Sequence, residues 1–369
     1  MASSFRAFLK RKDIEPSLQR YGIDAMSAMA QGLFCTLLVG TILNTLGSQF
    51  NIGLLTKAYF TIAGNSYTVG SLASAMAGPA MAVAIGYALK APGTVLFSLP
   101  AVGYATNALG GAGGPFAVYI VAIIAAEFGK MVSRETRIDI LVTPLVTLLS
   151  GTLVAALIAE PIGLAASRLG KLIIWATQQQ PFLMGILVST IVGMALTLPI
   201  SSAAICAGLG LTGLAGGAAL AGCCAQMVGF AVMSFRENKW GGLVSQGIGT
   251  SMLQMGNILR NPRIWIPPIV TGMITGPVAT CIFRLEMNGA AINSGMGTCG
   301  LCGPIGVWTG WVEPSAAALA NGATAITAGA SDWLGLALVS IVLPAIICPL
   351  VAFPLRKAGW IKDGDCKLN

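Results

Sequence analysis

The sequence predicts an all-α polytopic membrane protein with about eight to ten transmembrane helices and re-entrant hairpins, and three observations support this fold class. Only 9% of the 369 residues are charged and 55% are hydrophobic, whereas a soluble domain carries roughly a quarter charged residues. Several uncharged runs approach the ~20 residues that a helix needs to cross a bilayer. These runs are continuous, unlike the alternating strands of a membrane β-barrel.

Basic residues at both ends of the chain predict its orientation. The net charge is +8, and much of it flanks the first and last apolar runs. Positively charged segments stay on the cytoplasmic side, so both termini are expected in the cytoplasm. A nucleic-acid partner is not expected, because these charges border apolar spans and have no aromatic residues interleaved. The flanking residues are Arg6, Lys10, Arg11, Lys12, Arg20, Arg356, Lys357, Lys362 and Lys367.

Three parts follow in order: a cytoplasmic or interfacial N-terminal segment (1–23), a single membrane domain (24–355) and a cytoplasmic tail (356–369). The domain opens with apolar runs at 25–46 and 68–89. The second run is rich in Ala, Gly and Ser, which let helix backbones approach closely.

The next stretch alternates short apolar runs with strong breaks. A run that follows Lys90-Ala-Pro92 ends at Leu109, and the glycine-rich residues 110–115 interrupt it before a helix resumes at 116–128. The charged residues 130–139 suit a cytoplasmic loop. The span 140–158 is expected to end at Glu160-Pro161, because proline disrupts a helix. The amphipathic stretch 164–175 is then expected to lie in the membrane interface.

The second half contains four further runs and one irregular region. Spans are expected at 181–209, 212–235, 264–283 and 333–355. Residues 288–330 are rich in Gly and Ala without a clean apolar run, which indicates a re-entrant hairpin and a short helix.

Three breaks predict a polar cavity at membrane depth: Asn107–Pro115, Thr197–Ser202 and Asn293–Pro304. Interrupted helices expose backbone groups and helix ends, which membrane transporters use to bind polar solutes. The alternative is that Gly and Pro here only kink helices and ease their packing.

Uncharged polar side chains near these breaks are the candidate solute ligands. Such groups are costly in apolar surroundings unless they are paired. Gln246, Thr250, Gln254 and Asn257 have the spacing of one helix face, although an interfacial helix could show the same pattern. Glu313 follows two tryptophans, an arrangement that suits a sugar or, alternatively, an aromatic belt at the interface. The candidates are Ser201, Ser202, Gln226, Gln246, Thr250, Gln254, Asn257, Asn293 and Glu313.

The sequence does not predict an enzyme. It has no histidine, which excludes a phosphohistidine and the commonest general base. It has no Walker loop for ATP hydrolysis. The nine cysteines are expected to be buried small side chains without disulfides, and no metal site or cofactor is expected, although Cys299-Gly-Leu-Cys302 is a lone CxxC motif.

Four segments resemble the bacterial phosphotransferase-system enzyme-IIC-like membrane proteins, in particular their stand-alone PfoR-like branch. They are GPAMAVAIGYALKAPG (78–93), AAEFGKMVSRETRIDILVTPLVTLLSG (125–151), QPFLMGILVSTIVGMALTLPISSAAI (180–205) and CCAQMVGFAVMSFRENKWGGLVSQGIGTSMLQMGNILRNPRIWIPP (223–268). The resemblance covers about residues 20–355.

The resemblance implies a bacterial inner-membrane homodimer that works by an elevator-type movement. It implies a dimerisation or scaffold part (24–176), a substrate-binding transport part (177–330) and a last span (331–355). Two features depart from the sugar-phosphorylating members. The chain has no IIA or IIB domain, and Gly310-Trp311-Val312-Glu313-Pro314 keeps only Gly and Glu-Pro of their Gly-Ile-Thr-Glu-Pro-like sugar motif.

The sequence thus predicts a transporter or facilitator of a small polar solute, sugar-like or a small organic acid. One alternative is a membrane-embedded solute sensor that regulates gene expression. Another is a phosphorylation-coupled sugar permease that uses separate IIA and IIB proteins.

Overall fold

The computed structural model describes residues 2–62 and 64–368, and its chain forms two compact units. Unit 1 comprises Met1–Asn44 and Lys57–Ala165, and unit 2 comprises Thr45–Thr56 and Ala166–Asn369. Residues 1 and 369, which the predicted terminal segments include, lie outside the described part of the chain. The unit boundary falls inside a long helix, α10 (Asp139–Thr177).

Unit 1 is a helical bundle with one small hairpin. Helices α2, α6, α8 and α9 pack on one another. Small residues make this possible: a Cβ added to Gly103 would lie 2.7 Å from the Ala82 side chain of α6. Two strands, β1 (Phe60–Ile62) and β2 (Asn65–Tyr67), pair antiparallel with Phe60 opposite Tyr67. The helices are α1 (Ala2–Arg11), α2 (Ala25–Leu33), the start of α3 (Val39–Gln49), α5 (Val69–Ala75), α6 (Ala77–Ala88), α7 (Gly93–Leu96), α8 (Leu99–Gly110), α9 (Gly114–Val132) and the first part of α10.

The predicted break at Asn107–Pro115 is confirmed. Helix α8 ends at Gly110, and Gly111 has a φ of 50°, a value that glycine adopts without the steric cost a side chain would bring. Helices α8 and α9 then pack against each other.

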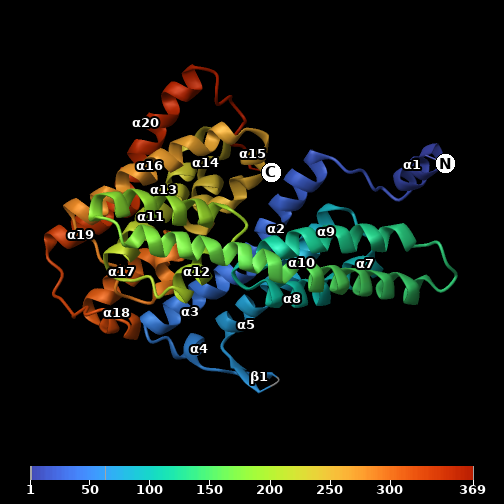
Figure 1. The fold of residues 1–369 in the computed structure, drawn as a ribbon, viewed down its shortest axis with the longest axis horizontal. Helices are drawn as coiled ribbons and strands as arrows, with labels where there is room; N and C mark the ends of the chain where they lie inside the picture. The colour runs from blue at the N-terminus through green and yellow to red at the C-terminus, as the bar shows by residue number, and fades with distance from the viewer. Residues whose placement is uncertain (1, 63, 369) are drawn as a thin grey trace. The chain divides into compact units, whose positions relative to one another are not determined.

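Unit 2 is built around α13 (Gly213–Met233). In the most apolar stretch of this helix, 94% of the residues are buried. Helices α11, α16 and α20 surround it, and Figure 1 shows α11, α13 and α16 side by side. A Cβ added to Gly193 of α11 would lie 2.7 Å from the carbonyl oxygen of Gly222 of α13. The helices are α4 (Gly53–Thr56), α11 (Pro181–Thr197), α12 (Ser202–Gly208), α13, α14 (Phe235–Val244), α15 (Met255–Arg260), α16 (Ile266–Pro277), α17 (Cys302–Val312), α18 (Ala316–Ala320), α19 (Ala330–Ala337), α20 (Leu343–Lys357) and the ends of α3 and α10.

The helical membrane fold is confirmed, with fewer long spans than expected. Among the described residues, six helical segments are long and apolar enough to cross a membrane, or seven if α5 and α6, which bend by 51° at their junction, form one span. The count is below eight because α11 has only 17 residues and because α8 and α9 fall in one segment. The six segments are Leu18–Gln49, Gly93–Val132, Asp139–Thr177, Gly213–Met233, Pro262–Ile282 and Ala330–Lys357.

Helix α10 corrects the interpretation of residues 140–175. Glu160-Pro161 does not end the span, and the amphipathic stretch 164–175 is not a separate interfacial helix, because α10 runs unbroken for 39 residues with Pro144 and Pro161 inside it. A proline removes one backbone hydrogen bond. Ending the helix in lipid would expose several such groups, so the helix continues.

The two units overlap only partly with the parts inferred from the resemblance. The division expected between residues 176 and 177 lies inside unit 2, and the last span belongs to unit 2 because α20 packs on α13 and α16. The assignment of dimerisation and transport roles to these parts stays a prediction.

Candidate functional site

All nine residues predicted to contact the solute lie in unit 2. The structure separates them into three groups, buried except for the half-buried Ser201, and one exposed residue. The first group lies at the break between α11 and α12, the second around Gln226, and the third along residues 246–257. Glu313 is the exposed residue.

The break between α11 and α12 follows directly from the sequence Leu198-Pro199. A residue before proline avoids the helical region, and Leu198 is extended, with φ −70° and ψ 158°. Helix α12 then starts at a cap, because the Ser201 Oγ accepts a hydrogen bond of 3.2 Å from the Ala204 N–H. The predicted break at Thr197–Ser202 is confirmed, and Ser201 serves as a helix cap.

The second and third predicted breaks meet each other. The 3₁₀ turn Ala291–Gly295 overlaps the start of the region Asn293–Pro304. This turn packs on α12. The buried Ser202 donates a 2.8 Å hydrogen bond from its Oγ to the Gly295 carbonyl. Asn293 of the same turn is 2% exposed, and its Oδ1 has no hydrogen-bond partner among the described residues.

A hydrogen-bond network at the end of α11 surrounds Gln226. The Thr197 Oγ1 donates to the Gln226 Oε1 over 3.0 Å, and the Trp265 Nε1 donates to the same oxygen over 2.8 Å. The Thr197 and Ser251 hydroxyls lie 2.8 Å apart. Thr197, Gln226 and Ser251 are buried. We call these four residues, Thr197, Gln226, Ser251 and Trp265, the break network.

A second network, the amide cluster, consists of Gln246, Gln254 and Asn257. The Gln254 Nε2 donates to the Gln246 Oε1, and the Asn257 Nδ2 donates to the Gln254 Oε1, both over 2.8 Å. The Gln246 Nε2 donates to the Ser234 Oγ over 2.9 Å. At exposures of 0 to 5%, these side chains are not the polar surface of an interfacial helix.

The prediction of a single helix face over residues 246–257 is wrong at Thr250. This residue is extended, with φ −158° and ψ 142°, and its hydroxyl accepts a hydrogen bond from the Met252 N–H. A π-helical turn (Ser245–Gly249) precedes Thr250, and a 3₁₀ turn (Ser251–Gln254) follows it. The chain bends here because a threonine hydroxyl that caps the next turn favours an extended backbone.

The C-terminal tail is hydrogen-bonded to the amide cluster through its backbone carbonyls. The Gln254 Nε2 and the Asn238 Nδ2 donate to the Cys366 carbonyl over 2.9 and 2.7 Å, and the Asn257 Nδ2 donates to the Lys367 carbonyl over 2.9 Å. Cys366 is fully buried, and burial raises the pKa of its thiol to about 12. The backbone carbonyls of the predicted cytoplasmic tail therefore satisfy these amides.

Glu313 lies apart from the buried groups. It is exposed at the end of α17. A cavity of about 500 Å³ is lined by Trp308, Trp311 and Trp333 with Thr327 and neighbouring apolar residues, and Glu313 is not among its lining residues. The rings of Trp311 and Trp333 are 5.0 Å apart in a T-shaped arrangement. A sugar-contact role for Glu313 stays a prediction.

The sequence interpretation named the polar stretch but missed the partners that organise it. Thr197 was treated only as the edge of a break, and Trp265 and Ser234 were not considered. The one available signal was position: Thr197 carries the last hydroxyl before the Leu198-Pro199 break, where a helix end leaves polar groups to satisfy. Pairings across 29 to 39 residues, such as Thr197 and Trp265 with Gln226, leave no local pattern.

The described residues contain no group of three or more Cys, Asp or Glu side chains able to hold a metal ion. All nine cysteines are free thiols. The polar groups of the break network and the amide cluster are amides, hydroxyls and an indole, which suit hydrogen bonding to a neutral or weakly charged solute.

No curated protein and no solved structure matches the chain. The family model described as "Phosphotransferase system, EIIC" matches residues 23–368, nearly the whole chain. The chain therefore belongs to the phosphotransferase-system EIIC family of multi-pass membrane transport components.

Proposed function

We propose that this protein moves a small polar solute, sugar-like or a small organic acid, across the bacterial inner membrane, and that the solute binds beside the break network of unit 2. The observation that carries this proposal is the network itself. Three buried polar side chains and one indole N–H converge where α11 is interrupted. Uncharged donors and acceptors are the groups that bind solute hydroxyls at membrane depth.

Binding would exchange protein hydrogen bonds for solute hydrogen bonds. The Gln226 Oε1 accepts two hydrogen bonds in this conformation, so a solute hydroxyl would replace the hydroxyl of Thr197 or the indole of Trp265. Asn293 offers a further acceptor, because its buried Oδ1 has no protein partner among the described residues. The Ser202 bond to Gly295 holds the Asn293 turn next to the break.

We further propose that unit 2 is the moving transport part of an elevator-type homodimer. The breaks at residues 197–202 and 293–304 and the break network all lie in unit 2. The family membership supports transport as the general role. The solute, the movement and the dimer are the parts of this proposal that experiment must test.

A ligand screen tests the proposed site. Purified protein is heated with sugars, sugar acids and carboxylates, and a binding solute raises the melting temperature. The rise should disappear in Thr197→Val, which removes the hydroxyl but keeps the shape. It should persist in Thr152→Val, whose exposed hydroxyl bonds only to its own helix. Stabilisation that survives Thr197→Val and Gln226→Leu would place the solute elsewhere.

Two other modes of action give different results in the same preparation. A solute sensor would bind without carrying labelled solute into vesicles. A phosphorylation-coupled permease would produce a phosphorylated sugar only after separate IIA and IIB proteins are added. Facilitated transport, the mode proposed here, requires neither protein.

A further inference from the structure

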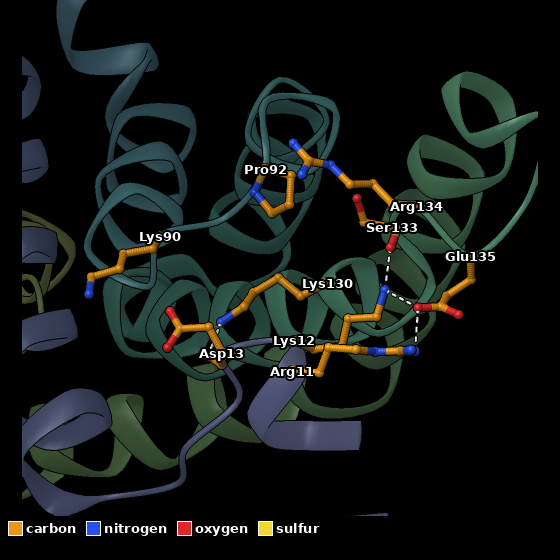
Figure 2. Close-up of a pocket in the computed structure, with 9 residues that line it drawn as sticks. All are labelled: Arg11, Lys12, Asp13, Lys90, Pro92, Lys130, Ser133, Arg134 and Glu135. Carbon is orange, nitrogen blue, oxygen red and sulfur yellow. Dashed lines mark hydrogen bonds and ion pairs between the residues drawn. The ribbon is translucent and has the colours of Figure 1, made fainter. Parts of the chain in front are cut away.

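Unit 1 contains a pocket far in sequence from the candidate solute site. Its volume is about 550 Å³. Three chain segments line it: the end of α1, the turn between α6 and α7, and the end of α9 (Figure 2). The apolar segments start at Leu18 and end at Val132, so the pocket lies where these helices would leave the membrane. The lining residues are Arg11, Lys12, Asp13, Lys90, Pro92, Lys130, Ser133, Arg134 and Glu135.

The pocket is rich in positive charge, since five lining residues are basic and two are acidic. Both carboxylates already have cationic partners. The Arg11 Nη2 lies 2.7 Å from the Glu135 Oε1, and Lys12 pairs with the same carboxylate. Asp13 receives two hydrogen bonds from Arg20, of 2.9 and 2.6 Å. The two lining acids are therefore already paired and do not compensate the charges of the remaining basic residues.

Arg134 and Lys90 supply that remaining charge. Among the described residues, neither side chain makes a hydrogen bond or an ion pair. Figure 2 shows the Arg134 guanidinium extended toward Pro92. The Lys90 side chain lies at the opposite side of the view, and its ammonium points away from Arg134. A guanidinium presents several donors in a plane, which suits the oxygens of a phosphate group.

The pocket also contains a buried hydroxyl without a partner. Ser133 is 4% exposed, and its Oγ has no hydrogen-bond partner in the described part of the chain. Buried polar groups are nearly always satisfied, so such a group is explained best by a ligand or water that bonds to it. Next to Ser133, the buried Lys130 ammonium donates to the carbonyls of Asp13 and Leu89 over 2.6 and 3.1 Å. The Glu127 carboxylate, 3.1 Å from the same ammonium, balances its charge.

Each of the three lining segments has one residue in the left-handed backbone region. The φ angles are 54° for Asp13, 56° for Lys90 and 60° for Arg134, three of the seven such non-glycine residues in the described chain. This conformation is unfavourable for residues with a side chain and concentrates at ligand sites, where the surrounding structure maintains it.

We propose that this pocket binds a phosphate group, contacted by the Arg134 guanidinium and the Ser133 hydroxyl, with Lys90 adding a second unpaired positive charge. Phosphate fits better than a carboxylate because it offers more acceptor oxygens and more charge to a site with several donors. The phosphate group belongs either to an anionic lipid or to a soluble phosphorylated compound. This inference is independent of the solute site in unit 2.

Titration calorimetry on the purified full chain in uncharged detergent tests the proposal. The probes are inorganic phosphate, glucose 6-phosphate and short-chain phosphatidylglycerol, each at the same ionic strength. Arg134→Gln should weaken binding about tenfold or more, the loss expected for a charge-assisted hydrogen bond. Ser133→Ala should weaken it severalfold while the protein stays folded, because the change removes an unsatisfied group.

The matched control is Arg137→Gln in the same loop. Arg137 is exposed and does not line the pocket, so this variant should bind like the natural protein. Binding of the soluble phosphates identifies a soluble ligand, whereas binding of phosphatidylglycerol alone identifies a lipid headgroup. An equal loss in Arg134→Gln and Arg137→Gln, or no binding of any probe, would overturn the proposal.

Discussion

At the scale of single residues, glycine determines how closely the central helices of unit 2 approach. Gly222 of α13 faces the backbone of Ser189 on α11, where an added Cβ would overlap backbone atoms. The Ser189 Oγ in turn donates a 2.7 Å hydrogen bond to the Gly272 carbonyl of α16. Helices α11 and α13 therefore touch at Gly222 without room for a methyl group, and α16 is bonded to α11 beside this contact.

Gly222→Ala should destabilise the protein by about 1–3 kcal/mol, the usual cost of overpacking a well-packed interior. The backbone of α11 would have to move, which also disturbs the Ser189 bond. The measurement is the melting temperature in detergent. Gly208→Ala is the control, because an added Cβ there has no atom within 4 Å. Equal melting temperatures for both variants would contradict the close contact.

The individual polar residues illustrate what the sequence can predict. The sequence marked Gln226, Gln254 and Asn257 as polar side chains that need a partner in apolar surroundings, and in the structure they are buried with protein partners. Their contact with a solute stays a prediction. The sequence could not predict the partners. The acceptor for Asn257 is a tail carbonyl 110 residues away, and backbone carbonyls carry no sequence signature.

At the scale of elements, ion pairs attach the N-terminal segment to the loop after α9. Glu135 bonds to Arg11 and Lys12 at once, and Lys12 also donates to the Ser133 carbonyl. These contacts hold the end of α1, a short helix with basic residues in its last turn.

Glu135→Gln should loosen the end of α1, since the amide keeps the shape but loses the charge. Trypsin cleaves after lysine and arginine, so cleavage at Arg11 and Lys12 should become several times faster. Glu15→Gln is the control, because Glu15 is exposed and makes no described ion pair. Identical cleavage rates in the two variants would show that Glu135 does not hold this segment.

Acid should release the same segment. Hydrogen bonds from Arg20 and Lys12 lower the pKa of Asp13 and Glu135 below their ordinary values of 3.8 and 4.5. The contribution of these carboxylates to stability is therefore complete above about pH 4.5 and is lost as the pH falls through the lowered pKa values.

Hydrogen exchange of the α1 amides measures this release. After correction for the intrinsic effect of pH, protection should be constant from pH 7 to about pH 5 and should fall below about pH 4. Two results would contradict the assignment of these ion pairs: unprotected α1 amides at neutral pH, or full protection that persists even at pH 2.

The C-terminal tail is a second docked element. Its carbonyls at Cys366 and Lys367 bond to Asn238, Gln254 and Asn257. Docking buries the Cys366 thiol, and burial raises its pKa to about 12. The thiol should therefore resist alkylation while the tail stays in place.

In a background without the exposed Cys35 and Cys281, maleimide should label Cys366 slowly. Asn238→Ala removes one donor to the Cys366 carbonyl and the acceptor for the Leu368 N–H, so labelling should become at least several times faster. Asn321→Ala, a change elsewhere in unit 2, should leave the rate unchanged. Fast labelling of the unaltered tail would mean that it is not docked.

Helices show the limit of local sequence rules in a membrane. Breaks with glycine or with Leu-Pro were predicted correctly at residues 107–115 and 197–202. Proline at 161 was overinterpreted, because α10 continues through it. In lipid the cost of exposed backbone groups outweighs the single hydrogen bond that proline removes.

At the scale of the whole molecule, composition and apolar run length were sufficient for the fold class, and four sequence segments were sufficient for the family. The candidate site was predicted as a set of polar residues in one half of the chain. Its division into a break network, an amide cluster filled by the tail and a separate Glu313 depends on tertiary packing, which local patterns do not record.

The central claim is that the break network of unit 2 binds a solute that the protein carries across the membrane. The most direct test is counterflow of the solute found in the screen, with labelled solute outside and unlabelled solute inside proteoliposomes. Gln226→Leu should reduce uptake by about tenfold, because the solute hydroxyl loses the Gln226 Oε1 as its acceptor. Gln178→Leu, at an exposed position in the same unit, should transport normally. Transport by Gln226→Leu at the natural rate, or equal loss in both variants, would contradict the claim.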